Sequence, residues 1–587
     1  MNDRDLVDLG ISPEFHPFVK NLSRQASSGD RMPFIGRQKE LEAVMETLLR
    51  RLKNYLILVG SPGVGKTALI TELADRINRG NVPVFLKGKV ILELSIHTFF
   101  YSRDPGGEGA IRDLEKFFAE IRQNRDRIIL FLDEMQIQSI YGADNQEPLG
   151  HFQRLLKTTI ANRELTIIAA ATPEDYFKYV KTDEILATSF SAILISEPEK
   201  KEMLRILRGV QKYFECYYKL QIPGSLFDDI YLLAERYIPH RAFPDKAIEL
   251  LDISCSKASV KKSKKLSLDF IYQSVSSISR LPIEVVRRDP QLHYRGMLDY
   301  LRQKTVNQAS ALEEISRILK IAKLAVDANR LRPEGIFLFL GPPGIGKSYV
   351  AARIAEYLFG SPDKLRIIDL ASFTRPGDAE RLIRSEEAGS SGILIDEVED
   401  HPFAVILFEN IESAHAGVLD FLNKTLTKGE ILDRFGKKYF LSNLIFILSL
   451  TSIGQERKDS AIGFVSEANA KPEIIVSPKI MNVLGWVDEI IQFNPLSTEH
   501  LLKIASETID KLKTELKTKF HCTLKVERKV PELIASNAQK SGRFAYTVKE
   551  MVEREIKLKA MDLITKGNQT LTLNVTRKQN KIEVAAE

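Results

Sequence analysis

Apolar positions repeat in a similar order in the two halves of the 587-residue chain. Each half contains a short apolar run, a glycine-rich loop and a segment whose apolar residues recur with helical spacing. The apolar runs cover residues 55–59 and 336–340, and the helical segments cover residues 68–77 and 349–358. Short apolar runs bounded by turn residues indicate buried strands. The pattern therefore predicts two copies of a strand–loop–helix unit.

Further apolar runs follow each copy. They predict a second and a third strand, at 128–132 and 165–170 in the first half and at 405–408 and 444–448 in the second. Strands that alternate with helices favour parallel α/β layers. Amphipathic segments come next, at roughly 200–279 and 499–564, and we interpret them as small helical lids.

The predicted fold class is α/β, with two tandem modules that each consist of a parallel-sheet subdomain and a helical lid. The expected domains are an N-terminal extension (1–32), a first α/β subdomain (33–195), a first lid (196–280), a second α/β subdomain (281–498) and a second lid (499–587).

Composition narrows the choice of partner only slightly. Hydrophobic residues make up 44% of the chain and charged residues 28%, which is enough apolar material for several cores. A net charge of +6 over this length does not favour nucleic-acid binding. The basic run at 257–265 fits either a solvated connector or a nucleic-acid patch, and we favour the connector.

The N-terminus is charged and no apolar run of signal-peptide or membrane length follows it. Three cysteines, Cys216, Cys255 and Cys522, lack metal-like spacing and fit a reducing compartment. We therefore expect a cytoplasmic protein with no membrane partner.

Both glycine-rich loops match the phosphate-binding pattern G-x-x-x-x-G-K-[ST] between a predicted strand and a predicted helix. The first loop is Gly60, Ser61, Pro62, Gly63, Val64, Gly65, Lys66 and Thr67, and the second is Gly341, Pro342, Pro343, Gly344, Ile345, Gly346, Lys347 and Ser348. Glycines let backbone N–H groups converge on phosphate oxygens at a helix N-terminus. Each lysine can reach the β- and γ-phosphates, and each hydroxyl can bind Mg²⁺. The loops predict two ATP sites with Mg²⁺.

The first module also has acidic residues where a phosphoryl-transfer site needs them. Asp133 and Glu134 follow the strand at 128–132. The first carboxylate can hold Mg²⁺, and the second can polarise the attacking water. Thr172 follows the third strand and can contact the γ-phosphate or that water. We expect Glu134 and Thr172 to be the catalytic residues.

Pro33-Phe34-Ile35-Gly36-Arg37 resembles the opening segment of the first ATPase module in the Clp family of AAA+ protein unfoldases. The resemblance extends to the end of the chain and is closest to the ClpA and ClpC branch, without its N-terminal repeat domain or a coiled-coil insertion. It implies two AAA+ modules, with Ile35 lining the adenine pocket. It also implies a hexamer of identical or mixed chains that acts on a protein client.

Two acidic pairs compete for the metal-binding strand of the second module. Lys66 precedes Asp133 by 67 positions, whereas Lys347 precedes Asp396 by 49 and Glu409 by 62. Spacing and resemblance both favour Glu409, which together with Ser348 would hold Mg²⁺. The next residue is Asn410, and an amide cannot act as a base. We expect this site to bind ATP and to hydrolyse it poorly.

Other positions depart from the family pattern. Clp rings supply an arginine to the neighbouring subunit's site, worth about 10³–10⁵ in rate in such reactions. The matching positions hold Thr188 and Ser189 in the first module and Trp486 in the second. The central-pore aromatic of the first module is replaced by Pro105, with Tyr101 nearby. These departures predict a weak ATPase.

One tripeptide favours a retained Clp role. Ile462, Gly463 and Phe464 stand where Clp unfoldases that feed a peptidase carry a docking loop, so a ClpP-like peptidase is a candidate partner. The leading hypothesis is a chaperone-type ATPase. Its rival is a nucleotide-gated scaffold or regulatory subunit, which could co-assemble with an active Clp ring. A DNA-associated AAA+ protein is a third alternative, resting on the basic run.

Overall fold

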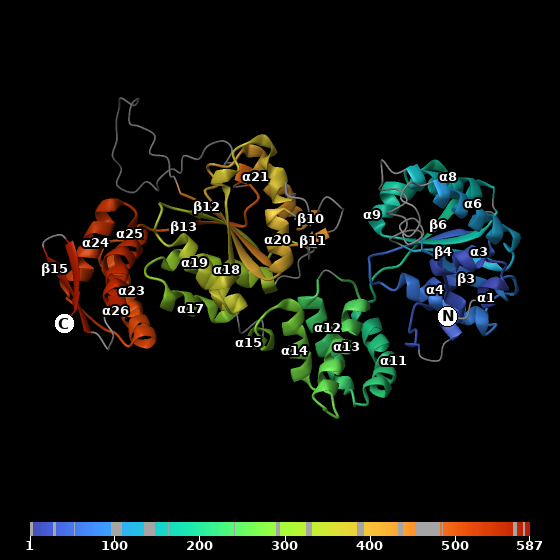
Figure 1. Cartoon of the computed structure of the whole chain (residues 1–587), viewed down its shortest axis with the longest axis horizontal. Coiled ribbons are helices and arrows are strands. Elements are labelled where there is room, and N and C mark those ends of the chain that lie inside the picture. The colour runs from blue at the N-terminus through green and yellow to red at the C-terminus, as the bar shows by residue number, and fades with distance from the viewer. Residues whose placement is uncertain are drawn as a thin grey trace. The chain divides into compact units, whose positions relative to one another are not determined.

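The chain forms two compact units, Met1–Ile278 and Ser279–Glu587. The computed structural model describes residues 4–27, 31–51, 53–95, 108–133, 147–162, 164–239, 241–288, 294–324, 332–383, 392–432, 438–451, 482–483, 485–566, 572–578 and 581–586. Each unit contains a mainly parallel sheet and a lid of helices, as the sequence predicted (Figure 1). No helix among these residues is both long enough and apolar enough to cross a membrane.

Five parallel strands form most of the first sheet, in the order β3-β4-β5-β2-β6. They are β2 (Tyr55–Val59), β3 (Val90–Leu94), β4 (Ile128–Leu132), β5 (Thr166–Ala171) and β6 (Phe190–Leu194). Every residue of β2, β4 and β5 is buried, as expected for apolar strands covered on both faces. The sequence predicted these three central strands but not β3 or β6.

Helices cover both faces of this sheet (Figure 1). On one face lie α6 (Glu108–Gln123) and α8 (Glu147–Ala161), and on the other lie α3 (Gln38–Leu49) and α4 (Lys66–Asn78). The phosphate loop, Asp133 and Thr172 directly follow β2, β4 and β5. Because parallel strands end at one edge of a sheet, these three features share one edge.

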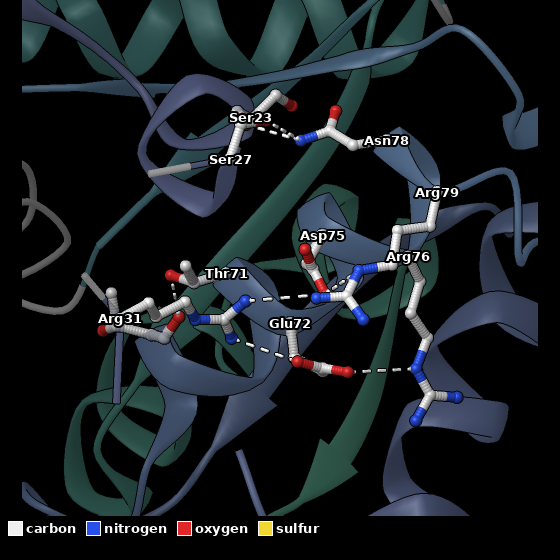
Figure 2. A network of polar contacts seen from close by, with 10 residues as sticks. Ser23, Ser27, Arg31, Thr71, Glu72, Asp75, Arg76, Asn78 and Arg79 are labelled. Carbon is white, nitrogen blue, oxygen red and sulfur yellow. Dashed lines mark hydrogen bonds and ion pairs between the residues drawn. The ribbon is translucent and has the colours of Figure 1, made fainter. Parts of the chain in front are cut away.

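The N-terminal segment is part of the first unit rather than a separate extension. It comprises α1 (Arg4–Val7), η1 (Pro13–Phe18), β1 (Val19–Asn21) and α2 (Leu22–Ser27). Strand β1 pairs antiparallel with β3 and becomes the sixth strand of the sheet. Figure 2 shows polar contacts that join this segment to α4, including one from the Asn78 amide to the Ser27 hydroxyl at 2.9 Å.

The first lid follows β6 and a short connection. Its helices are α11 (Lys200–Tyr218), α12 (Phe227–Tyr237), α13 (Asp245–Val260) and α14 (Leu268–Ser279). The basic run begins inside this lid, on the last turn of α13, where Lys257 donates to the Gln273 carbonyl at 2.8 Å. The run continues as the turn that joins α13 to α14, where Lys261, Lys262, Lys264 and Lys265 are exposed, as expected for a solvated connector.

The second sheet has the strand order β13-β7-β12-β9-β8, and all five strands are parallel. They are β7 (Gly335–Leu340), β8 (Leu365–Asp369), β9 (Ala404–Glu409), β12 (Leu444–Leu450) and β13 (Glu489–Gln492). Helices α20 (Ile393–Asp400) and α21 (Ala416–Lys428) pack on one face. Helix α19 (Lys347–Phe359) follows the phosphate loop, and α17 (Met297–Lys304) and α18 (Ala309–Leu324) precede β7. A small hairpin, β10 (Glu430–Leu432) and β11 (Lys438–Phe440), follows α21.

The second lid contains helices and a small sheet. The helices are α23 (Thr498–Phe520), α24 (Lys529–Ser541), α25 (Phe544–Met551) and α26 (Leu558–Lys566). Strands β14 (Thr523–Val526), β15 (Thr572–Lys578) and β16 (Lys581–Ala586) form the sheet. The sequence predicted the helices only, because these strands alternate apolar residues with lysines and other polar residues and contain no continuous apolar run.

Candidate nucleotide-binding sites

The first phosphate loop closes around the amine of its lysine. Lys66 is 4% exposed, and its Nζ donates to the carbonyls of Gly60 at 2.6 Å and Ser61 at 3.1 Å. Gly65, at the N-cap of α4, has a φ of 96°, a conformation that L side chains rarely adopt. A helix N-terminus with a buried lysine amine fits the phosphates of a nucleotide.

Two predicted oxygen ligands for Mg²⁺ meet at the end of β4. The Thr67 hydroxyl donates to Asp133 Oδ2 at 3.3 Å, so the two predicted metal ligands lie within contact of each other. Hydroxyl and carboxylate oxygens are suitable Mg²⁺ ligands, and the residues therefore fit the ion. Thr172 instead caps α9 (Pro173–Asp175), where its hydroxyl donates to Asp175 Oδ2 at 2.7 Å.

The segment around Ile35 lies between the sheet and the lid. A methyl group added at Gly209 of α11 would lie 2.4 Å from Ile35 Cγ1, so the two residues are closely packed. Arg37, 8% exposed, donates to the carbonyls of Ser196 at 2.5 Å and Val64 at 3.5 Å. This guanidinium ties the phosphate loop to the start of the lid connection.

The second phosphate loop has the same geometry. Lys347 is 6% exposed and donates to the carbonyls of Gly341 and, at 3.1 Å, Pro342. Burial lowers the pKa of its ammonium group to about 8, while the carboxylates of Glu412 and Glu409 oppose this shift. Bound phosphates would favour the charged form of the lysine.

The structure places Glu409 beside Ser348, the other residue predicted to hold the second Mg²⁺. The Ser348 hydroxyl donates to Glu409 Oε1 at 2.6 Å, as Thr67 does to Asp133. Asp396 lies on helix α20 rather than at a strand end. The oxygen pair at this site also fits Mg²⁺.

Two polar residues of the second site were missed in the sequence. Gln308 is fully buried and donates to the Asn494 carbonyl at 2.7 Å and to the Ile345 carbonyl at 3.5 Å. It therefore joins the second phosphate loop to the segment after the last strand of its sheet, as Arg37 does in the first module. Thr451 directly follows β12, as Thr172 follows β5. A signal did exist for Gln308, since Val306-Asn307-Gln308 precedes a helix as Ile35-Gly36-Arg37 does.

The second lid contacts the phosphate loop directly. The Ala545 backbone N–H donates to the Gly344 carbonyl at 2.9 Å. A methyl group added at Gly344 would lie 2.0 Å from the Arg543 carbonyl oxygen. The Arg543 guanidinium stacks on the Tyr546 ring at 4.3 Å. The backbone of Arg543 and Ala545 therefore lies directly against the second phosphate loop.

We expect Gly344→Ala to detach α25 from the loop. Amide hydrogen exchange at Ala545 should accelerate at least about tenfold without nucleotide, because the added methyl group meets backbone that cannot yield locally. Gly346→Ala is the matched control. Gly346 also has a positive φ, 108°, but an added methyl group there meets nothing within 4 Å. Equal exchange in the two variants would contradict the contact.

Several of the predicted functional residues are not among those that the structure describes. Glu134, Tyr101, Pro105 and Ile462, Gly463 and Phe464 lie outside the described residues. The arginine positions are described. Thr188 and Ser189 end α10 (Glu184–Ser189), and Trp486, 9% exposed, packs into the core of the second unit.

Family models match three parts of the chain. The model described as "ATPase family associated with various cellular activities (AAA)" matches residues 56–180, and "AAA lid domain" matches 199–294. The model described as "AAA domain (Cdc48 subfamily)" matches residues 332–485. Both phosphate-loop units therefore contain an AAA module.

The chain is also similar to whole Clp proteins. The "ATP-dependent Clp protease ATP-binding subunit ClpC" of Staphylococcus aureus (strain USA300) is 26% identical over 98% of this chain and 79% of its own length. The "Negative regulator of genetic competence ClpC/MecB" of Bacillus subtilis (strain 168) is 28% identical over 86% and 71%. The chain belongs to the Clp family of AAA+ ATPases. The resemblance noted in its sequence is therefore confirmed.

Solved structures of Saccharomyces cerevisiae Hsp104 show the same fold. The "Hsp104-ADP complex" aligns with a TM-score of 0.72 and 24% identity, over 96% of this chain and 98% of that one. The "Hsp104:casein complex, Extended Conformation" aligns with a TM-score of 0.67 and 24% identity, over 97% and 99%. Two tandem AAA modules with lids thus account for nearly the whole Clp-family chain.

Proposed function

We propose that this Clp-family chain binds MgATP at both phosphate loops and hydrolyses it slowly, mainly at the first, to remodel or unfold a protein partner. The observation that carries the proposal is the presence of two phosphate loops, each with a buried lysine and a hydroxyl–carboxylate pair. Such a pair and lysine supply the charge stabilisation that phosphoryl transfer requires.

In the first module we assign binding to residues 60–67 and Mg²⁺ to Thr67 and Asp133. Glu134 would polarise the attacking water, and Thr172 would turn toward the γ-phosphate from its present cap on α9. Ile35 would line the adenine pocket. Slow turnover follows from Thr188 and Ser189, which offer no cation to a neighbouring subunit.

In the second module we assign nucleotide binding to residues 341–348 and Mg²⁺ to Ser348 and Glu409. Its turnover would be far slower, because Asn410 occupies the position of the water-polarising carboxylate. Nucleotide bound there would chiefly stabilise the oligomer, because it would hold the second lid against the phosphate loop at Gly344.

We propose a ring of identical or mixed chains, most simply a hexamer, as the working assembly. One of the aligned Hsp104 structures is a complex with casein, so we choose casein as the first client to test. Docking of a ClpP-like peptidase at Ile462, Gly463 and Phe464 stays a prediction from sequence.

The alternative is a nucleotide-gated scaffold or regulatory subunit with little hydrolysis. It is favoured because both positions that hold an arginine in Clp rings carry other residues. One of them, Trp486, is buried in a core and cannot reach the site of a neighbouring subunit. Such a subunit could join an active Clp ring that supplies the missing cations.

Binding of fluorescein-labelled casein tests the leading proposal. We expect the purified chain to bind casein at least about fivefold more tightly with ATPγS than with ADP, because a client-remodelling ATPase must hold its client differently in its two nucleotide states. Fluorescence anisotropy gives the affinities, and light scattering gives the size of the complex. Tight nucleotide binding with equal casein affinities and no turnover would favour the scaffold instead.

A further inference from the structure

The two modules carry the same kinds of side chain after the metal-site strand, in opposite order. In the first, Glu134 directly follows the strand-end acid and Gln136 stands two positions later. In the second, Asn410 directly follows and Glu412 stands two positions later. A carboxylate and an amide have exchanged places. The second module has therefore kept two carboxylates beside its phosphate loop.

Asn410 turns away from the phosphate loop. Its backbone is left-handed, with a φ of 58°, and its side-chain amide donates to Asp369 Oδ1 at 2.8 Å. Asp369 ends β8, the edge strand of the sheet. In the order β7-β12-β9-β8, this edge lies on the far side of β9 from the strand that leads into the phosphate loop.

Glu412 turns the opposite way. Its Oε1 accepts from the Thr451 backbone N–H at 3.3 Å and from the Thr451 hydroxyl. Thr451 directly follows β12, whose last residue, Leu450, pairs with Leu340 at the end of β7. The Ile411 backbone N–H donates to the Ser449 carbonyl at 3.4 Å and holds the turn on β12. The Glu412 carboxylate is therefore on the phosphate-loop side of β9.

We propose that Glu412 is the catalytic carboxylate of the second site, where it polarises water for a slow hydrolysis of ATP. The inference rests on the proposed function, because it requires MgATP at the second phosphate loop. Thr451 is a positioning residue, since its two hydrogen bonds fix one oxygen of the carboxylate.

The step balances without any further reactant. The water oxygen forms a bond to the γ-phosphorus, and the bond from that phosphorus to the β–γ bridging oxygen breaks. The electron pair of the broken bond stays on ADP, and Glu412 accepts a proton from the water and later releases it to solvent. The products are ADP, phosphate and one proton.

The test uses the full chain with Glu134→Gln, so that turnover at the first site is suppressed while its phosphate loop stays intact. Adding Glu412→Gln should lower the residual kcat at least about tenfold, because an amide cannot take the proton. ATP affinity should stay within about threefold, since glutamine keeps the shape and an oxygen for Thr451. Asp396→Asn is the control. It removes the rival carboxylate on α20, and residual turnover should be unchanged.

Three outcomes would overturn the inference. In the first, Glu412→Gln leaves the residual turnover of the Glu134→Gln chain intact. In the second, that residual turnover is no higher than the turnover of a Lys66→Ala, Lys347→Ala double variant. In the third, Glu412→Gln lowers ATP affinity together with turnover. Wild-type turnover separates these from failure of the proposed function. A wild-type chain that does not hydrolyse ATP contradicts both the proposed function and the role of Glu412. An active wild-type chain whose residual turnover is insensitive to Glu412→Gln contradicts only the role of Glu412.

Discussion

Lys66→Ala should lower steady-state ATP turnover of the full chain by about 10²–10³-fold, the cost of removing one preorganised charge-stabilising donor. The amine is already held at the base of the loop by the Gly60 and Ser61 carbonyls. It needs only to turn to the phosphates of a bound nucleotide. Alanine leaves the loop backbone intact but removes the positive charge that the proposed function assigns to the γ-phosphate.

Lys347→Ala is the matched variant, because that lysine is buried to the same degree and makes the same two contacts in its own loop. We expect it to retain most of the turnover, since the proposed function assigns only a small part to the second site. Coupled-enzyme measurement of phosphate release at saturating ATP gives both rates. A larger loss with Lys347→Ala than with Lys66→Ala would assign the main activity to the second module.

Local patterns explain how much of the fold could be predicted. Strands β2, β4, β7 and β12 are continuous apolar runs, and a glycine-rich loop before a helix has few alternative structures. Their order along the chain was enough to predict tandem parallel sheets. Spacing favoured Glu409 over Asp396, because the strand that carries the acid must return to the same edge of the sheet, and in the structure Glu409 ends a strand whereas Asp396 lies on a helix.

What could not be predicted depends on contacts between distant segments. Gln308 bonds to the carbonyls of Asn494 and Ile345, and although its place before a helix can be noticed in the sequence, these long-range partners cannot be read from it. The docking of the second lid on Gly344 joins positions about 200 residues apart. Even the orientation of Glu412 depends on Thr451, which follows a different strand. A polar residue near a strand end can be named from sequence, but its direction is set by its neighbours in the sheet.

The N-terminal segment shows the same limit, since it carries no motif and yet completes the first core. Phe15 is fully buried, with its ring 5.4 Å from that of Phe117 on α6. Arg31 follows the segment and pairs with Glu72 at 3.1 Å and Asp75 at 3.9 Å on α4, the helix that begins at Lys66 (Figure 2). The segment thus packs against both helical layers of the module that contains the proposed first ATP site.

We therefore expect Phe15→Ala to lower the free energy of unfolding of the first unit by about 3–5 kcal/mol, the usual loss for a large aromatic side chain removed from a core. Urea unfolding of the full chain would measure the change, and hydrogen exchange in β4 and β5 would assign it to the first unit. Val84→Ala, at a side chain that is 83% exposed, should shift stability by less than about 0.5 kcal/mol. If Phe15→Ala were as mild as Val84→Ala, the N-terminal segment would be a detachable extension. ATP turnover at the first site should then survive its removal.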